Sequence, residues 1–374
     1  MSKLEEMLER LCPNGVERKS LGTVVNVLRG ERVTKKELRA NGEYPVISGG
    51  VRPLGWLGKY NREAGTITVA QYGSAGYVDW QERRFWANDV CYCLEPICDL
   101  SEKYLYYVLK RNQSLLYSLR IEAVPAHLPK DRLLDFKIPF PPRPVQDEIV
   151  KALDALDAAV KALEEERAAR QEQFEALREK LVNAGGKVEL GTVAHYSQER
   201  VATSQIAKGN YVNVELLLPN KMGRAERSLL PHESNCVRFK SGDVLIGNIR
   251  PYLKKIWLAD VNGGTNGDVL VVTPNDDGKL NSKYLFYALS QDDFFTYASC
   301  KVKAGKMPRG DKASMLRYAI SMPDVSTQQK IAEQLDAFAA VVAAQDEEVA
   351  ARREQFAGWL ERLMTFDARE VAVA

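Results

Sequence analysis

The chain has 374 residues, 45% of them hydrophobic and 27% charged, with a formal net charge of +2. This length exceeds one ordinary core, so two or three domains are expected, and the composition is that of a soluble globular protein. The sequence has no run of about 18 apolar residues, which excludes a transmembrane helix, and the amphipathic start MSKLEEMLERL does not resemble a signal peptide. We therefore expect a cytoplasmic protein.

Residues 1–138 are predicted to form a strand-rich domain that opens with the short amphipathic helix. The runs 65–70 and 89–94 have strand character, and a small helix is expected at 103–109. Each strand run is followed by turn-forming or polar residues. This first block therefore reads as a mixed domain with a helix near its end.

Cysteines and histidines in this chain do not predict a metal site. Cys91, Cys93 and Cys98 form the main cluster, but a zinc site needs a fourth ligand and CxxC-like spacing. The spacing of Cys91 and Cys93 favours two small buried residues on one face of a strand. The three histidines are scattered along the chain.

Residues 139–186 and 321–374 are predicted to form two long helical rods that are copies of each other. An offset of 182 aligns residues 138–182 with 320–364 without a gap, and 20 of the 45 positions are identical. This similarity establishes an internal repeat. The identical pairs include Gln146 and Gln328, Asp154 and Asp336, Arg170 and Arg352, and Phe174 and Phe356.

Both rods carry an apolar seam with a period of 3.5 residues, which predicts a coiled coil. Because a lone rod with one apolar seam is unstable, we expect the rods to pair with each other, antiparallel and about a pseudo-twofold axis. Arg167 and Arg170 would then approach the acidic residues 346–348, with residues 164–166 near Arg352 and Arg353. We predict that Arg170 lies within salt-bridge reach of residues 346–348. The seam residues are Ile149, Leu153, Leu156, Val160, Leu163, Phe174, Leu177 and Leu181 in the first rod, and Ile331, Leu335, Phe338, Val342, Val349, Phe356, Trp359 and Leu363 in the second.

Residues 187–320 form a second block that echoes the first. The tetrapeptide LGTV occurs at 21–24 and again at 190–193, and the helix-like run KYLYYVL at 103–109 returns as KYLFYAL at 283–289. The blocks have diverged far more than the rods. The fold class that follows is α+β: a tandem repeat of two strand-rich heads separated by two long helices in an antiparallel coiled coil.

The near-neutral net charge hides an alternation along the chain. Residues 1–138 carry 21 Lys and Arg against 17 Asp and Glu, and residues 187–320 carry 19 against 13. The rods are acidic, with 7 against 10 in residues 139–186 and 5 against 10 in residues 321–374. Basic heads hint at a polyanionic partner and acidic helices at a protein partner.

This organisation resembles the specificity subunit of type I restriction-modification enzymes over essentially the whole chain. The resemblance rests on the duplicated layout and on the rod starts IPFPPRPVQ at 138–146 and ISMPDVSTQ at 320–328, with GDVLI at 242–246. Val145 and Thr327 stand where the family usually has an acid.

The resemblance implies that each head is a target-recognition domain reading one half of a bipartite, asymmetric site in double-stranded DNA. The coiled coil would set the spacing between the half-sites. It would also recruit two methyltransferase subunits and, in the full complex, restriction subunits. S-adenosylmethionine and ATP would bind those partners, and this chain would hold no cofactor.

Catalytic motifs do not point to an enzyme. Residues 304–306, AGK, lack the first glycine and the hydroxyl of a phosphate-binding loop. The sequence has no Asn-Pro-Pro-aromatic methyltransferase motif, and the Asp-x-Lys at 277–279 reads as a turn rather than as part of a nuclease metal site. We expect a non-catalytic subunit.

Candidate DNA contacts follow from chemistry and loop position. Phosphates are bound by Lys and Arg, whereas base edges are read by forked or amide side chains. Most such residues are ordinarily solvated surface charges, and loop position favours Arg250 and Arg309 most. The second-block candidates are Asn248, Arg250, Tyr252, Lys254 and Lys255 after one strand, and Lys303, Lys306 and Arg309 on a later loop. The first-block candidates are Gln71, Tyr72 and Ser74 in the corresponding post-strand loop, and Arg29, Arg32, Lys35 and Lys36 in another basic loop.

Two other functions are open at this level. The chain could be a coiled-coil scaffold whose heads bind protein or glycan ligands, with no role on DNA. A free-standing repressor is less favoured because the heads show no helix-turn-helix pattern. Steep weakening of duplex binding by salt would favour DNA recognition over the scaffold.

Overall fold

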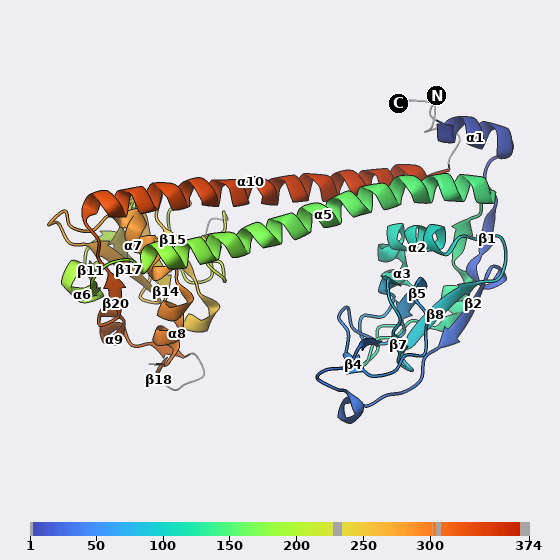
Figure 1. Ribbon diagram of the computed structural model, residues 1–374, viewed down its shortest axis with the longest axis horizontal. Coiled ribbons are helices and arrows are strands. Elements are labelled where there is room, and N and C mark those ends of the chain that lie inside the picture. The colour runs from blue at the N-terminus through green and yellow to red at the C-terminus, as the bar shows by residue number, and fades with distance from the viewer. Residues whose placement is uncertain (1–2, 227–233, 301, 304–307, 367–374) are drawn as a thin grey trace. The chain divides into compact units, whose positions relative to one another are not determined.

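A computed structural model of the protein describes residues 3–226, 234–300, 302–303 and 308–366. The chain divides into two compact units, one made of Met1–Glu164 with Glu347–Ala374 and the other of Glu165–Asp346. Each unit combines one head with half of each long helix (Figure 1). We call residues 3–139 head 1 and residues 187–321 head 2. Among the described helices, none has the length and apolar character to cross a membrane.

Head 1 is built on a four-stranded antiparallel sheet with the order β2-β8-β5-β6, and α2 packs on it. A three-stranded sheet of order β4-β3-β7 and the ribbon β1-β9 complete its strands. The strands are β1 (Arg18–Ser20), β2 (Val25–Arg29), β3 (Tyr44–Ile47), β4 (Gly55–Leu57), β5 (Thr66–Ala70), β6 (Val78–Gln81), β7 (Trp86–Ala87), β8 (Cys91–Pro96) and β9 (Lys137–Pro139). The helices are α1 (Lys3–Leu11), η1 (Leu21–Thr23), η2 (Lys35–Glu37), α2 (Glu102–Arg111), α3 (Gln113–Ser118) and α4 (Lys130–Asp135).

Head 2 repeats the four-stranded sheet as β11-β17-β14-β15 and the ribbon as β10-β20. Its three-stranded sheet has the order β12-β13-β16, and β18 pairs with β19. The strands are β10 (Lys187–Glu189), β11 (Ala194–Tyr196), β12 (Arg200–Ala202), β13 (Asn235–Phe239), β14 (Val244–Gly247), β15 (Ile256–Leu258), β16 (Gly263–Thr265), β17 (Val269–Pro274), β18 (Val302–Lys303), β19 (Arg309–Gly310) and β20 (Ala319–Ser321). The helices are α6 (Leu190–Val193), η3 (Thr203–Gln205), η4 (Pro251–Leu253), α7 (Ser282–Leu289), α8 (Asp292–Cys300) and α9 (Lys312–Leu316).

The two heads share strand order and register, so the predicted duplication extends to the fold. Val25 faces Pro96 in head 1, and Ala194 faces Pro274 in head 2. The heads diverge in the smaller sheet, where β3 pairs with β7 in parallel but β13 pairs with β16 antiparallel. The predicted mixed α+β class with two long helices is confirmed.

The repeated LGTV tetrapeptide makes equivalent backbone contacts in both heads. The Leu21 amide donates to the Phe136 carbonyl at 2.8 Å, and the Leu190 amide donates to the Tyr318 carbonyl at 2.9 Å. A Cβ added at Gly22 would lie 3.1 Å from Leu134 Cβ, so the following glycine allows the chain to pass close to α4. The motif therefore closes the end of each head.

The two glutamines shared by the rod starts explain another part of the repeat. Gln146 is fully buried; its Oε1 accepts from the Ser101 amide at 2.8 Å, and its Nε2 donates to the carbonyls of Asp99 and Pro141 at 3.1 and 2.8 Å. Gln328 is fully buried in the same way. Its Oε1 accepts from the Asn281 amide at 2.8 Å, and its Nε2 donates to the carbonyls of Lys279 and Pro323 at 2.9 and 2.8 Å. Each rod start is thus fastened to the cap of a head helix.

A second pair of contacts joins rod to head about two turns further along each long helix. The Tyr107 hydroxyl donates to Asp154 at 2.6 Å, and the Tyr287 hydroxyl donates to Asp336 at 2.7 Å. Burial and the neighbouring carboxylate raise the pKa of both phenols, so the hydroxyls stay protonated donors. The identity of Asp154 with Asp336 in the repeat follows from this shared bond.

The rods are the helices α5 (Arg143–Val182) and α10 (Val325–Met364), and they pair antiparallel within each unit. In the first unit Arg353 pairs with Glu164 at 2.6 Å, and in the second Arg167 pairs with Asp346 at 2.7 Å. The antiparallel prediction and its opposite-charge pairing are confirmed. The specific partner proposed for Arg170 is wrong, because its guanidinium pairs with Glu166 one turn earlier on its own helix, at 2.8 Å.

The seam also departs from a strict coiled coil near the end of α10. Leu360 and Met364 are buried in the head 1 core, whereas the predicted seam residue Trp359 is 38% exposed. The same core contains head residues as well as α5 residues, including Ile149 and Leu153. The apolar stripe is displaced because α10 packs on a head here and not on α5 alone.

The sequence segments 1–138, 139–186, 187–320 and 321–374 are not the compact units of the structure. Each compact unit takes part of both rods, with the division after Glu164 and after Asp346. The helices themselves begin at Arg143 and Val325, just inside the predicted rod segments. The assignment of the four segments as functional domains stays a prediction.

Candidate nucleic-acid interface

The loop after the central strand is held in the same backbone frame in both heads. In head 1 the Gln71 amide donates to the Val90 carbonyl at 2.9 Å, and the Gln71 carbonyl accepts from the Leu128 amide at 2.8 Å. In head 2 the Asn248 amide donates to the Asp268 carbonyl at 2.9 Å, and its carbonyl accepts from the Gly310 amide at 3.2 Å. Residues 71–77, the β5–β6 loop, and residues 248–255, the β14–β15 loop, are therefore equivalent.

The two arginines that sequence favours most lie on adjacent segments. The Arg250 amide donates to the Pro308 carbonyl at 2.8 Å, and Ile249 forms an isolated bridge with Arg309. Both arginine side chains are exposed. The Arg309 guanidinium donates twice to Asp268 Oδ1, at 2.8 and 3.1 Å. Asp268 thus occupies the Nε–Nη2 edge of Arg309 and orients the guanidinium, whose other edge, Nη1–Nη2, suits bidentate recognition of a guanine or a phosphate.

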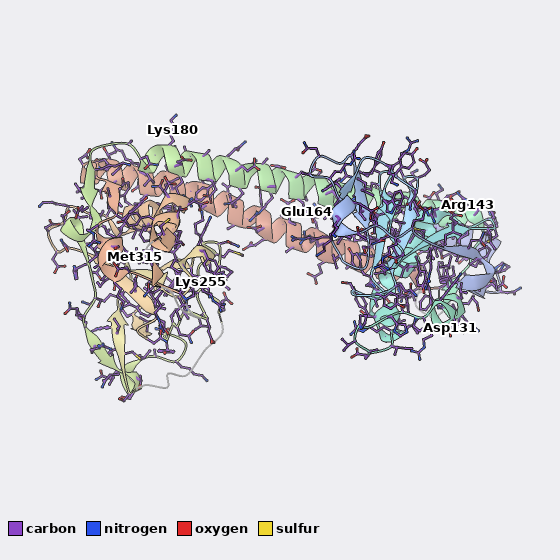
Figure 2. All side chains as sticks on the ribbon, turned by 90° about the horizontal axis from the view of Figure 1, so that it is seen from below. Asp131, Arg143, Glu164, Lys180, Lys255 and Met315 are labelled. Carbon is purple, nitrogen blue, oxygen red and sulfur yellow. The ribbon has the colours of Figure 1, made fainter. Side chains whose placement is uncertain are left out.

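The remaining candidates of the β14–β15 loop differ in exposure. Tyr252 is 56% exposed at the loop tip. Lys254 pairs with Asp292 at 2.8 Å. Lys255 (Figure 2) donates to the Val214 carbonyl at 2.6 Å, and burial lowers the pKa of its ammonium group. Asn248 is buried, and its Oδ1 has no hydrogen-bond partner. Contacts of these residues with DNA stay predictions, and the geometry gives Lys254 and Lys255 a part in holding the loop.

The basic run before α9 is described only in part. Lys303 lies in β18, where its Cα faces that of Arg309. Lys306 lies outside the described residues. β18 pairs with β19, and Arg309 of β19 bridges Ile249 of the β14–β15 loop.

The head 1 loop is less basic and more enclosed. Gln71 is buried, and its Oε1 accepts from Arg29 Nη2 at 3.0 Å. Tyr72 stacks on His127 with ring centroids 5.7 Å apart, and the Ser74 amide donates to the Gly49 carbonyl at 2.7 Å. These contacts bring Arg29 to the predicted post-strand loop, a link that sequence alone did not make.

Arg32, Lys35 and Lys36 are exposed on the loop that contains η2. The loop is anchored to the sheets by two hydrogen bonds: the Trp86 Nε1 donates to the Glu31 carbonyl at 2.8 Å, and the Val33 amide donates to Asn88 Oδ1 at 3.0 Å. A rigid loop that carries exposed cations suits phosphate contacts.

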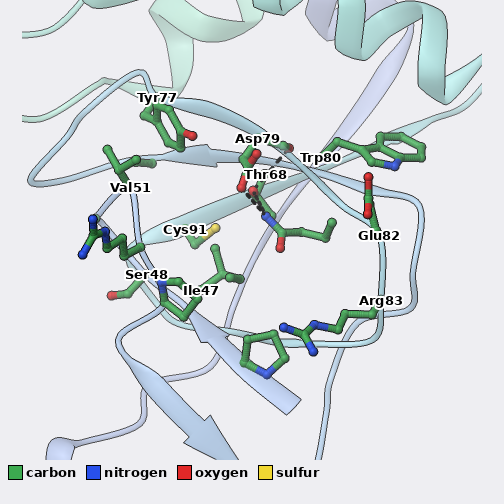
Figure 3. A pocket seen from close by; sticks show the side chains of 16 residues that line it. Ile47, Ser48, Val51, Thr68, Tyr77, Asp79, Trp80, Glu82, Arg83 and Cys91 are labelled. Atoms are coloured by element: carbon green, nitrogen blue, oxygen red, sulfur yellow. Dashed lines mark hydrogen bonds between the residues drawn. The ribbon is translucent and has the colours of Figure 1, made fainter. Parts of the chain in front are cut away.

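A cavity of about 550 Å³ lies in head 1 between the two sheets (Figure 3). On its wall Gln81 Nε2 donates to Thr68 Oγ1 at 3.0 Å and to Asp79 Oδ2 at 3.1 Å, and burial raises the pKa of the Asp79 carboxyl. Cys91 also lines the cavity. A hydrogen bond with Cys93 and burial raise the pKa of the Cys91 thiol, so it is not a thiolate nucleophile. The cavity offers no activated group for covalent chemistry.

Metal ligation finds no support in the described part of the chain, where no group of three or more His, Cys, Asp or Glu is placed to hold an ion. Cys91 and Cys93 are both buried in β8, as their spacing predicts. One further segment, residues 219–223, lies against the β14–β15 loop although sequence did not single it out: the Asn220 amide donates to the Leu253 carbonyl at 2.8 Å. A turn-forming Pro-Asn pair at 219–220 was its main sequence signal.

Two related heads with cationic loops, each joined to the paired long helices, define the layout of a modular recognition protein. The family of type I restriction modification DNA specificity domains matches residues 13–172 and again 187–349. The chain therefore belongs to this family, whose role is DNA recognition, and the scaffold alternative is not supported.

Individual relatives agree with the family match. A putative type I restriction enzyme specificity subunit of Haemophilus influenzae is 26% identical over 359 residues, which is 90% of each chain. A putative type I specificity subunit of Mycoplasma pneumoniae is 27% identical over 153 residues, 40% of each chain.

Solved structures share the fold. The S subunit of a type I restriction-modification system from M. genitalium matches with a TM-score of 0.61 and 16% identity, covering 94% of this chain and 97% of that one. A chain from a structure describing assembly and conformational transition of a type I system matches with a TM-score of 0.55 and 17% identity, covering 94% and 98%. These likenesses support the two-headed architecture.

Proposed function

We propose that this chain is the specificity subunit of a type I restriction-modification complex, in which each head reads one half of a bipartite, asymmetric site in double-stranded DNA. The paired rods set the separation of the half-sites and recruit two methyltransferase subunits. Restriction subunits join in the full complex. Methylation and cleavage, with S-adenosylmethionine and ATP, belong to these partners, and the complex acts in the cytoplasm.

The equivalence of the β5–β6 and β14–β15 loops is the observation that carries this proposal. Their backbones share donors and acceptors at Gln71 and Asn248, but the side chains that directly follow these two residues differ. Head 1 offers an aromatic ring and a hydroxyl at Tyr72 and Ser74, and head 2 offers an exposed guanidinium at Arg250. Two loops with equivalent backbone anchoring and different side chains suit the recognition of two different half-sites.

The charge alternation supports the division of labour between heads and rods. The basic heads suit the phosphate backbone, and the acidic rods suit protein partners rather than DNA. The site residues named above, apart from Lys254, are proposed as DNA contacts on these grounds, with Arg250 and Arg309 as the strongest candidates in head 2 and Arg29 with Tyr72 in head 1.

Replacement of head 2 tests this proposal. The chain, co-expressed with its methyltransferase subunit, is compared with a chimera whose residues 187–320 come from a relative of different specificity, and methylated motifs are read by genome sequencing. We expect one half of the motif to change and the other to persist. A change in both halves, or a complex that binds no duplex at any salt concentration, contradicts the proposal.

A further inference from the structure

Backbone strain in the described residues gathers at one place in head 2. The non-glycine residues with a positive φ are Asn220, Lys221, Arg250 and Lys254, at 57°, 64°, 52° and 52°. This left-handed conformation is unfavourable for residues with a Cβ, although Asn tolerates it better than most. Strain of this kind persists where surrounding structure imposes it, and it concentrates at functional sites.

The four residues belong to two loops that are bonded to each other. The Asn220 amide donates to the Leu253 carbonyl and the Lys221 amide to the Lys254 carbonyl, each at 2.8 Å. The Leu218 amide donates to the Gly223 carbonyl, also at 2.8 Å, which closes the turn. We call residues 219–223 the accessory loop. It is a defined turn that extends the surface of the β14–β15 loop.

A single carboxylate holds one lysine from each loop. Asp292, the first residue of α8, receives Lys221 on Oδ1 at 2.9 Å and Lys254 on Oδ2 at 2.8 Å. Lys221 also reaches Glu175 of α5 at 3.2 Å. Burial opposes ionisation of Asp292, but the hydrogen bonds from Lys254 and Lys221 outweigh it and lower the pKa of its carboxyl to about 2. The two ammonium groups are therefore engaged within the protein.

With these lysines engaged, other side chains of the paired loops remain on the surface. Met222 is 69% exposed and Tyr252 56% exposed, and Asn220 is exposed beside them. An amide can bond an adenine edge bidentately, and an apolar side chain can contact a thymine methyl group or wedge between base pairs. Asn220 and Met222 lie on a turn that is bonded to the β14–β15 loop, so they belong to the same surface as Arg250.

We propose that the accessory loop is a second DNA-reading segment of head 2, in which Asn220 and Met222 contact base edges and Asp292 positions both loops. The inference rests on the proposed function and deepens it. It assigns base contacts to residues outside the predicted set, and it assigns Lys254 to loop positioning rather than to DNA.

The test of the reading residues uses the complex with methyltransferase and a pool of duplexes randomised at the target site. Asn220→Ala and Met222→Ala are compared with the wild type, and Ile97→Ala, which removes an exposed apolar side chain in head 1, is the control. We expect about tenfold loss of discrimination at one or two base pairs of one half-site. Discrimination that is unchanged at every position in both variants overturns the reading role.

The test of Asp292 compares Asp292→Ala with Asp293→Ala, which removes the same charge from the same helical turn. Release of Lys221 and Lys254 should lower affinity for the cognate duplex and raise affinity for random duplex severalfold, whereas Asp293→Ala should leave their ratio nearly unchanged. Asp292→Glu keeps the carboxylate and should restore part of the ratio. Equal effects of the two alanine variants overturn the positioning role.

Different results contradict the proposed function and the role of the accessory loop. If the wild-type complex selects no bipartite site, the proposed function fails. If it selects one and the accessory-loop variants select the same site equally well, only this inference fails. Thermal unfolding of each variant separates loss of reading from loss of folding.

Discussion

The β5–β6 loop of head 1 and the β14–β15 loop of head 2 are anchored to their heads by equivalent backbone hydrogen bonds but carry different side chains. Gly73 and Arg250 stand two residues after the equivalent Gln71 and Asn248, with φ of 74° and 52°. At the other end, Gly76 and Lys254 have φ of 89° and 52°. Head 1 thus uses glycine at both left-handed positions, and head 2 uses basic residues.

Packing explains the difference. A Cβ at Gly73 would lie 2.7 Å from the Gly49 carbonyl oxygen, and one at Gly76 would lie 2.9 Å from the Leu116 carbonyl oxygen. In head 2 the loop faces the accessory loop instead, and the side chains of Arg250 and Lys254 have room. A left-handed backbone costs roughly 1–2 kcal/mol for each such residue. Head 2 therefore carries basic side chains at two left-handed positions where packing in head 1 leaves room only for glycine.

The largest expected effect tests the buried glutamine that joins each long helix to its head. Gln146→Leu and Gln328→Leu each remove three buried hydrogen bonds and leave backbone groups unsatisfied. We expect each to lower the free energy of unfolding by about 4 kcal/mol, measured by urea denaturation. The control is Gln329→Leu, an exposed neighbour. Clearly unequal losses in the two heads would mean that the two glutamines are not equivalent.

The next largest effect is expected from a substitution of Gly73 in the β5–β6 loop of head 1. Gly73→Arg places the head 2 side chain in head 1, where it meets the Gly49 carbonyl and a positive φ. We expect a loss of about 3 kcal/mol in unfolding free energy and loss of one half of the recognised motif. Gly50→Arg, which adds the same charge where a Cβ would make only ordinary van der Waals contact, 3.5 Å from the Arg52 carbonyl oxygen, should cost little. A stable Gly73→Arg variant would refute the packing explanation.

The reverse change in head 2 should separate strain from function. Arg250→Gly relieves the left-handed position and should raise the unfolding free energy by about 1 kcal/mol relative to Arg250→Ala, which retains a Cβ. Both variants should bind DNA less tightly. If Arg250 contacts a phosphate, the salt slope of binding falls by about one. Unchanged affinity and salt slope in both variants would remove Arg250 from the interface.

The smallest expected effect concerns the ion pairs between α5 and α10, of which each unit contains one. The Arg167–Asp346 pair is exposed, so a double-mutant cycle with Arg167→Ala and Asp346→Ala should give a coupling of about 0–1 kcal/mol that decreases with salt. The Arg353–Glu164 pair should behave alike. A coupling above about 2 kcal/mol in either would show that the ion pair stabilises its unit substantially rather than mainly favouring the orientation.

The repetitive parts of this molecule were predictable because their signals are local and periodic. Residue spacing alone predicts the apolar seam of α5 and α10 and the match of Gln146 with Gln328. The order of the acidic and basic runs predicts the antiparallel pairing. The choice of Arg167 over Arg170 was not predictable. It depends on which of two seam cations turns toward the neighbouring helix.

For the candidate interface, the sequence predicts individual residues but not which segments of the chain lie together. Arg250 and Arg309 could be named from loop context, but their adjacency depends on Pro308 meeting Arg250 across a separation of 58 positions. Left-handed Arg and Lys residues have no sequence signature, because those types ordinarily avoid that conformation. The accessory loop was missed for this reason, and also because its partner Asp292 lies far along the chain.

The two-stranded ribbons β1-β9 and β10-β20 bear on how a head can be exchanged between related genes. Ser20 faces Lys137 across β1 and β9, and Glu189 faces Ala319 across β10 and β20, so each head leaves and returns to the chain at neighbouring points. A stretch of gene that encodes everything between such points can be exchanged without moving the ends it must join. Recombination within one gene can therefore exchange a whole head of this protein while the two long helices stay as they were.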